Sequence, residues 1–113
     1  MKVLYVENNH SFIAAVKREF FRGFEVRVES TIKGAMSAFE SENFDLVLCD
    51  FDLDDGKGRV VVESIRKIDH EIPIIAVSSH AKGNDELLKA GANLQCPKME
   101  FGRINAVIRE VMK

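Results

Sequence analysis

Hydrophobic positions along the chain fall into two alternating kinds of segment. Short, nearly continuous apolar runs predict buried β-strands over 2–6, 45–49 and 72–77. A strictly alternating run predicts a half-exposed strand over 24–30, and a weaker, more polar run predicts a fifth strand over 92–97. Between and after these strands, apolar residues recur three and four positions apart, which predicts amphipathic helices over 11–21, 32–39, 59–69, 84–90 and 102–112.

Five strands alternating with five helices predict a parallel sheet covered by helices on both faces. Strands with continuous apolar runs belong in the centre, because both of their faces are buried, and the other two belong at the edges. Pro97 supports an edge position for the fifth strand, since proline has no N–H to donate to a neighbour. With right-handed crossovers, these demands give the strand order 2-1-3-4-5 in a flavodoxin-like (βα)5 three-layer α/β sandwich.

Composition narrows the class of protein. The 113 residues are 46% hydrophobic and 30% charged, which is ordinary for a single globular domain that folds without a disulfide or a metal. The net charge of -2 gives no basic surface for nucleic acid, and no apolar run is long enough for a signal peptide or a membrane span. Cys49 and Cys96 are expected to be reduced core residues, so we expect a cytoplasmic protein with no nucleic-acid or membrane partner.

Acidic residues gather where the third predicted strand ends, in the segment VLCDFDLDDGKG over 47–58. Asp50 ends that strand, and Glu7 and Asn8 follow the first strand. In an open parallel sheet, ligands bind beyond the carboxyl ends of the strands where the strand order reverses, which here is between the first and third strands. The oxygen atoms expected there are of the kind that Mg²⁺ prefers.

Two further polar residues are expected at the same edge of the sheet. Ser78 follows the fourth strand and Lys98 follows the fifth. A hydroxyl and an ammonium group are suited to holding phosphoryl oxygens. Ser79, the next residue after Ser78, is expected to cap the fourth helix, and Asp54 and Asp55 are expected to be solvated surface residues.

Taken together, these positions resemble the receiver domain of bacterial two-component response regulators over essentially the whole chain, 1–113. In that family an acidic pair follows the first strand, a phosphate-accepting Asp ends the third, a Ser or Thr ends the fourth, and a Lys follows the fifth. The family also has a Gly eight residues after the acceptor, as Gly58 is here, and a turn like that in KAGANLQC over 89–96.

The resemblance implies a set of roles. Asp50 would be the phosphoacceptor, Ser78 and Lys98 would contact the phosphoryl group, and Mg²⁺ would be held by Glu7, Asn8, Asp50 and the backbone carbonyl of Asp52. The phosphoryl donor would be a sensor histidine kinase or a phosphotransfer protein, and the signal would pass to a downstream protein target by contact. The domain itself would not be an enzyme. Asp52 and His80 would flank the phosphoryl group and influence how fast water removes it.

The chain departs from the family pattern at several positions. Asn8 stands where the second acid is usual, so weak Mg²⁺ binding is expected. The usual Lys-Pro order is reversed at Pro97 and Lys98, which leaves open whether Lys98 reaches Asp50. Gln95 occupies the place of an aromatic switch residue, and the short segment between Ser78 and Gly91 predicts a stunted or distorted fourth helix.

Two other functions remain as alternatives. The departures are compatible with a pseudo-receiver, which keeps the fold but binds partners without phosphorylation. The segment DFDLDDG also resembles the first motif of haloacid-dehalogenase-type phosphatases, with Asp50 as nucleophile and Asp52 as general acid. That family needs a late acidic pair for Mg²⁺, and after Lys98 only Glu100 and Glu110 remain.

Overall fold

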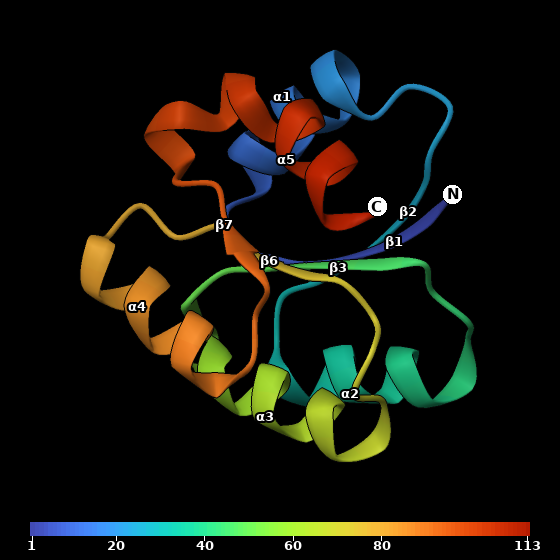
Figure 1. The fold of residues 1–113 in the computed structure, drawn as a ribbon, viewed down its shortest axis with the longest axis vertical. Coiled ribbons are helices and arrows are strands. Elements are labelled where there is room, and N and C mark those ends of the chain that lie inside the picture. The colour runs from blue at the N-terminus through green and yellow to red at the C-terminus, as the bar shows by residue number, and fades with distance from the viewer.

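Strands and helices alternate along the chain as predicted, in a computed structural model that describes residues 1–113 (Figure 1). The strands of the main sheet are β1 (Lys2–Val6), β2 (Glu25–Glu29), β3 (Leu46–Cys49), β6 (Ile74–Ala76) and β7 (Leu94–Gln95). The helices are α1 (His10–Phe20), α2 (Ile32–Ser41), α3 (Gly58–Ile68), α4 (Ala81–Ala90) and α5 (Ile104–Val111), and a 3-10 segment, η1 (Lys98–Arg103), leads into α5. A small antiparallel hairpin of β4 (Asp52–Leu53) and β5 (Gly56–Lys57) follows β3.

The main sheet is parallel throughout and has the order β2-β1-β3-β6-β7. This confirms the predicted order 2-1-3-4-5, with the alternating strand and the polar strand at the two edges. In Figure 1, α1 and α5 cover one face of the sheet, and α2 and α3 cover the other. The helix α4 packs on the same side as α3, because Leu87 of α4 shares a buried cluster with residues of α3.

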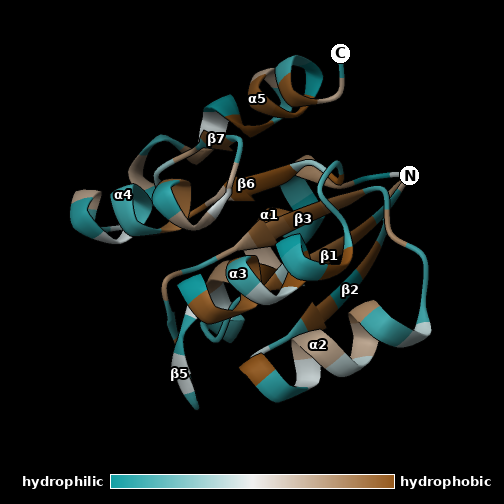
Figure 2. Cartoon of the chain, turned by 60° about the horizontal axis from the view of Figure 1, so that its bottom comes forward, coloured by the Kyte–Doolittle hydropathy of each residue, from teal (hydrophilic) through white to brown (hydrophobic).

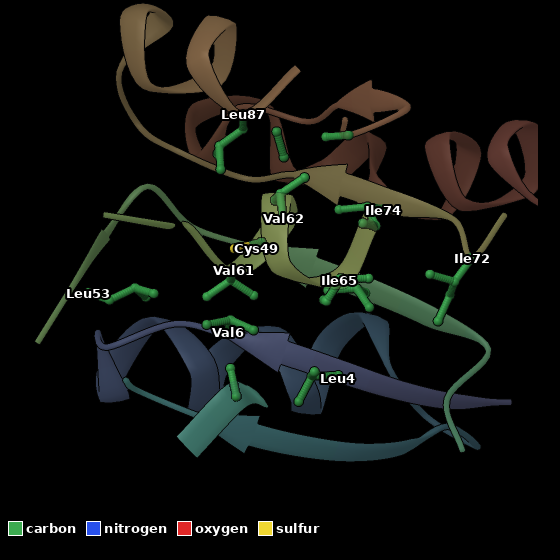
Figure 3. Close-up of a cluster of buried hydrophobic side chains, with 14 of the residues drawn as sticks. Leu4, Val6, Cys49, Leu53, Val61, Val62, Ile65, Ile72, Ile74 and Leu87 are labelled. Atoms are coloured by element: carbon green, nitrogen blue, oxygen red, sulfur yellow. The ribbon is translucent and has the colours of Figure 1, made fainter. Parts of the chain in front are cut away.

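Successive side chains of a strand point to opposite faces of the sheet. Because helices cover both faces, the side chains of the central strands are buried on both. In β1, Leu4 and Val6 join the cluster under α2, α3 and α4, whereas Val3 and Tyr5 join the cluster under α1 and α5. Figure 3 shows the first of these clusters, with Val61 among the α3 side chains directed at the strands. Figure 2 shows the consequence for hydropathy: the ribbons of β1, β3 and β6 are mainly brown (hydrophobic), whereas the helices carry both hydrophilic and hydrophobic residues.

The end of the sheet opposite the predicted site is fixed by one side chain. Arg66 of α3 donates from Nε to the Gly91 carbonyl (2.9 Å) and from a terminal nitrogen to the Ile72 carbonyl (2.8 Å). Its other terminal nitrogen donates to Asn93 Oδ1 (3.0 Å), which also accepts the Ile74 backbone N–H (2.9 Å). These bonds fasten α3, the start of β6 and the C-terminal end of α4 to one another.

Most predicted element bounds agree with the structure within two residues, and the largest departure is at α4. This helix begins at Ala81 rather than at 84 and has ten residues, so the prediction of a stunted fourth helix is wrong. Cys49 and Cys96 are both buried and free, as expected of core residues. None of the helices has the length and apolar character needed to cross a membrane.

Candidate functional site

The carboxyl ends of β1, β3 and the edge strand β7 bring three of the predicted site residues into contact. Glu7 follows β1, Asp50 follows β3, and Lys98 opens η1 after β7. The Lys98 ammonium donates to Asp50 Oδ2 at 2.8 Å and to Glu7 Oε2 at 2.9 Å. All three side chains are largely or wholly removed from solvent, with exposed fractions of 16% for Lys98, 7% for Asp50 and 0% for Glu7. Lys98 therefore does reach Asp50, despite the reversed order at Pro97 and Lys98.

This buried cluster holds two carboxylates against one ammonium group. Burial raises the pKa of Glu7 to about 7; the hydrogen bond from Lys98 opposes the rise and the charge of Asp50 adds to it. Burial alone would lower the pKa of Lys98, but its hydrogen bonds to Asp50 and Glu7 outweigh this, so the pKa lies above its ordinary value. Glu7 Oε1 and the buried Tyr5 hydroxyl have no hydrogen-bond partner. The pKa of Tyr5 is raised mainly by burial and to a smaller extent by the charge of Glu7.

The backbone around Asp50 is fixed by hydrogen bonds and by close packing against Gly58. Asp50 Oδ1 accepts the Phe51 N–H (2.7 Å), and the Asp50 N–H donates to the Val6 carbonyl (2.9 Å). The chain then folds back so tightly that the Gly58 N–H donates to the Phe51 carbonyl (2.5 Å). A Cβ at Gly58 would overlap the Asp50 carbonyl oxygen, which explains a glycine eight residues after the acidic residue.

The hairpin after Asp50 makes contacts that sequence reasoning missed. The Asp55 carboxylate accepts the backbone N–H groups of Ile32 (2.6 Å) and Lys33 (3.2 Å) and so caps the start of α2 from 23 residues away. Asp54 lies beside it; its Oδ1 accepts from the Asn8 side-chain amide (3.3 Å). Both residues are exposed, as expected, but Asp55 is more than a solvated charge. The cluster of Asp and Gly after β3 is a turn signal that could have indicated the hairpin.

Asn8, which follows Glu7, is half-buried, and Asp52, two residues after Asp50, is exposed. Asn8 does not cap α1: the cap is Asn9, whose Oδ1 accepts the Phe12 N–H (3.0 Å). The Asp52 carboxylate is exposed and forms an ion pair with Lys57. A cavity of about 570 Å³ opens beside Asp52, and its lining also includes Phe51, Lys57, Arg59, His80, Lys82, Gly83 and Glu86.

Ser78 is buried beneath the first turn of α4. Its Oγ accepts the His80 N–H (3.1 Å), and no hydrogen bond joins it to Asp50. The cap position of α4 is His80, which makes no side-chain capping bond, so the expectation that Ser79 caps this helix is wrong. Asn84, which sequence reasoning passed over, contacts the Ser78 backbone. Its position three residues before the buried Leu87 places it on the inner face of α4 and could have indicated its burial.

The residues at this site fit a hard divalent cation. The cluster has an excess of negative charge, and Glu7 Oε1 is a buried acceptor without a partner. The amide of Asn8 and the backbone carbonyl of Asp52 would add neutral oxygens. No three His, Cys, Asp or Glu side chains form a metal-binding group by themselves.

Comparisons with known proteins agree with this arrangement. The family model described as "Response regulator receiver domain" matches residues 3–109. Transcription factor prr1 of Schizosaccharomyces pombe is 35% identical over 69 residues, which are 59% of this chain and 13% of that protein. The chain therefore spans only a small part of the curated relative that it matches.

Solved structures share the fold across almost the entire chain. Response regulator protein TrrA from Thermotoga maritima, solved in complex with Mg²⁺-BeF, has a TM-score of 0.87 and 22% identity, covering 97% of each chain. The non-phosphorylated HemR receiver domain from Leptospira biflexa has a TM-score of 0.85 and 23% identity, covering 99% of this chain and 94% of that one.

Proposed function

Because this chain belongs to the family of response regulator receiver domains, we propose that it signals by accepting a phosphoryl group on Asp50. The observation that carries the proposal is the position of Lys98, whose ammonium contacts Asp50 Oδ2 and Glu7 Oε2 at once. A phosphoryl group adds close to two negative charges, and Lys98 would pair with one of its oxygens.

In the proposed reaction, the Asp50 carboxylate attacks the phosphorus of a phosphohistidine on a sensor histidine kinase or phosphotransfer protein. An O–P bond forms to Asp50 while the N–P bond of the donor breaks and its imidazole leaves. The N–H of Phe51 holds Oδ1 and Lys98 holds Oδ2, so the carboxylate is oriented before the donor arrives. Lys98 has little solvent around it, so its attraction to the developing charge is only weakly screened.

The residues that would hold Mg²⁺ are Asp50, Asn8 and the carbonyl of Asp52, with Glu7 acting through water. The ion supplies charge neutralisation on the transferring phosphoryl oxygens. The orphaned Oε1 of Glu7 supports this proposal, as does the TrrA relative, which was solved with Mg²⁺-BeF. Asn8 carries no charge, so we propose that binding is weak.

Ser78 would respond to the modification. Its hydroxyl would leave the His80 N–H and turn towards a phosphoryl oxygen on Asp50, which shifts an existing equilibrium between two arrangements of the loop after β6. Gln95 is exposed and has no ring to swing, so the response must travel by another route. We propose that the domain, 1–113, acts in the cytoplasm on a downstream protein by contact, without binding nucleic acid or membrane itself.

Labelling with acetyl phosphate and Mg²⁺, followed by intact-protein mass spectrometry, tests the proposal. The wild-type protein should gain one phosphoryl group, Asp50→Asn should gain none, and the nearby control Asp54→Asn should be labelled like the wild type. Equal labelling of wild type and Asp50→Asn would refute Asp50 as the acceptor. Absence of labelling in the wild type would favour a pseudo-receiver, and continuous release of phosphate would favour a phosphatase.

A further inference from the structure

Asn84 of α4 holds the backbone of Ser78 on both sides. Asn84 Oδ1 accepts the Ser78 N–H at 2.9 Å, and Asn84 Nδ2 donates to the Ser78 carbonyl at 3.0 Å. The Asn84 side chain is completely buried and Ser78 is 1% exposed, so water does not compete for these bonds. One side-chain amide thus pairs with both polar groups of one backbone residue.

This pairing supplements a strand neighbour, because the Lys98 N–H bonds to the Ser78 carbonyl two residues after the Cys96 N–H bonds to the Ala76 carbonyl (2.8 Å). Ser78 lies two residues beyond the end of β6, where the ladder with β3 has closed with the Val77 N–H on the Cys49 carbonyl (3.0 Å). The remaining backbone contact of Ser78 is a longer bond from the Lys98 N–H to its carbonyl (3.3 Å). The backbone of Ser78 is therefore held by α4 through two bonds and by Lys98 through one longer bond.

Packing around Gly83 joins Ser78 and the first turn of α4 more closely. A Cβ at Gly83 would lie 2.8 Å from Ser78 Oγ and 2.9 Å from Phe51 Cβ, so the helix sits against both residues with no room for a side chain. The Asn84 N–H also donates to the His80 carbonyl (3.1 Å), which closes the first turn over Ser78. Ser78 cannot move far without moving this turn or breaking the Asn84 bonds.

We propose that Asn84 is a positioning residue that fastens the Ser78 backbone to α4, so that a movement of Ser78 towards a phosphoryl group on Asp50 displaces α4 with it. This inference rests on the proposed function. Satisfying buried backbone groups would alone justify a polar side chain here. The further role follows from what Asn84 holds, because Ser78 carries the hydroxyl that must change partners, and Gln95 provides no ring to carry the change elsewhere.

Amide NMR chemical shifts measured with and without beryllofluoride and Mg²⁺ test the inference, with beryllofluoride as a stable substitute for the phosphoryl group. In the wild type, amides around Asp50 and Ser78 and amides of 81–90 should all shift. In Asn84→Ala, the amides around Asp50 should still shift, while the changes in 81–90 should fall to less than half of their wild-type size. Unchanged shifts in 81–90 would overturn the inference.

Asn93→Ala provides a matched control. Asn93 likewise holds a backbone N–H of the β6 segment, that of Ile74 (2.9 Å), but at the end of the strand away from Asp50. Its loss should lower stability without reducing the shifts in 81–90, and an equal reduction in both variants would show a structural effect only and overturn the inference. If no amide of the wild type shifts, the proposed function fails, and the inference fails with it.

If Asn84→Ala does not fold, amide hydrogen exchange measured on the wild type tests the inference instead. The Ser78 N–H should exchange slowly with solvent, since it is bonded to a buried acceptor. If Ser78 and α4 move as one, beryllofluoride should leave this protection within about tenfold of its value in the free protein. Loss of the protection would show that the Asn84 bonds break on activation and would overturn the inference.

Discussion

Replacing Glu7 by Gln measures what it costs to bury this carboxylate beside Asp50. Glu7 is fully buried, and burial raises its pKa from the ordinary 4.5 to about 7, with the Lys98 hydrogen bond opposing the rise. The folded protein therefore binds a proton at Glu7 more tightly than the unfolded chain does. This contribution to stability is fully present below about pH 4.5 and is lost as the pH rises through about 7.

The size of the loss follows from the two pKa values. A tenfold difference in proton affinity corresponds to about 1.4 kcal/mol, so the wild type should lose roughly 3 kcal/mol of unfolding free energy from this group between about pH 4.5 and pH 8. Gln cannot ionise, so Glu7→Gln should lack this loss. Other titrating groups are shared by both proteins and largely cancel when the two pH profiles are subtracted.

Urea unfolding followed by circular dichroism over this pH range, with a chelator present, provides the measurement. The stability of Glu7→Gln relative to wild type should rise by roughly 3 kcal/mol from the acidic to the alkaline end. Glu63→Gln is the control, because Glu63 is a half-exposed carboxylate on α3 paired with Arg59. A difference between wild type and Glu7→Gln that changes by less than about 1 kcal/mol across the range would refute the reasoning.

Three further predictions concern the surroundings of Asp50. Gly58→Ala should lower the unfolding free energy by about 1–3 kcal/mol, because a Cβ at this position would overlap the Asp50 carbonyl oxygen. Gly102→Ala is the control and should change the unfolding free energy little, because a Cβ there has no other atom within 4 Å. Urea unfolding compares the two variants. Asp55→Ala should lower the urea midpoint more than Asp54→Ala does, since of these two residues only Asp55 accepts N–H groups at the start of α2; equal midpoints would contradict the capping role. Asn8→Asp should tighten Mg²⁺ binding several-fold in a titration, because it adds a carboxylate beside Asp54; no gain would exclude Asn8 as a metal ligand.

The sheet could be predicted from the sequence because its signal is local and repeated. The last four residues of β1 and all four residues of β3 are buried. Strands that are buried on both faces require a continuous run of apolar residues, and such runs can be recognised in the sequence. Once the strand order follows from which runs are continuous, the carboxyl ends of β1 and β3 must be neighbours. Glu7 and Asp50 could be placed together on this basis, without any knowledge of their side-chain contacts.

The remaining features depend on contacts between distant residues. The start of α4 could not be predicted because Gly83 and Asn84 are poor helix formers, and they are held in the helix by packing on Phe51 and by bonds to Ser78. The reach of Lys98 depends on the path of η1, where the sequence pattern shows only the end of a strand and the start of a helix. The capping of α2 by Asp55 joins positions 23 residues apart.

The two ends of α4 are held differently, so the helix would pivot about its C-terminal end. At the C-terminal end of α4, Arg66 donates hydrogen bonds to the Gly91 carbonyl and to the Ile72 carbonyl just before β6. There is no room for a side chain at Gly91 beside Arg66. At its N-terminal end, the helix is attached to the loop that carries Ser78. Ten residues make a lever about 15 Å long, so a 1 Å displacement at Ser78 would swing the axis by about 4°. The outer surface of α4 would then present its exposed residues at a new angle, with the largest travel nearest to Asp50.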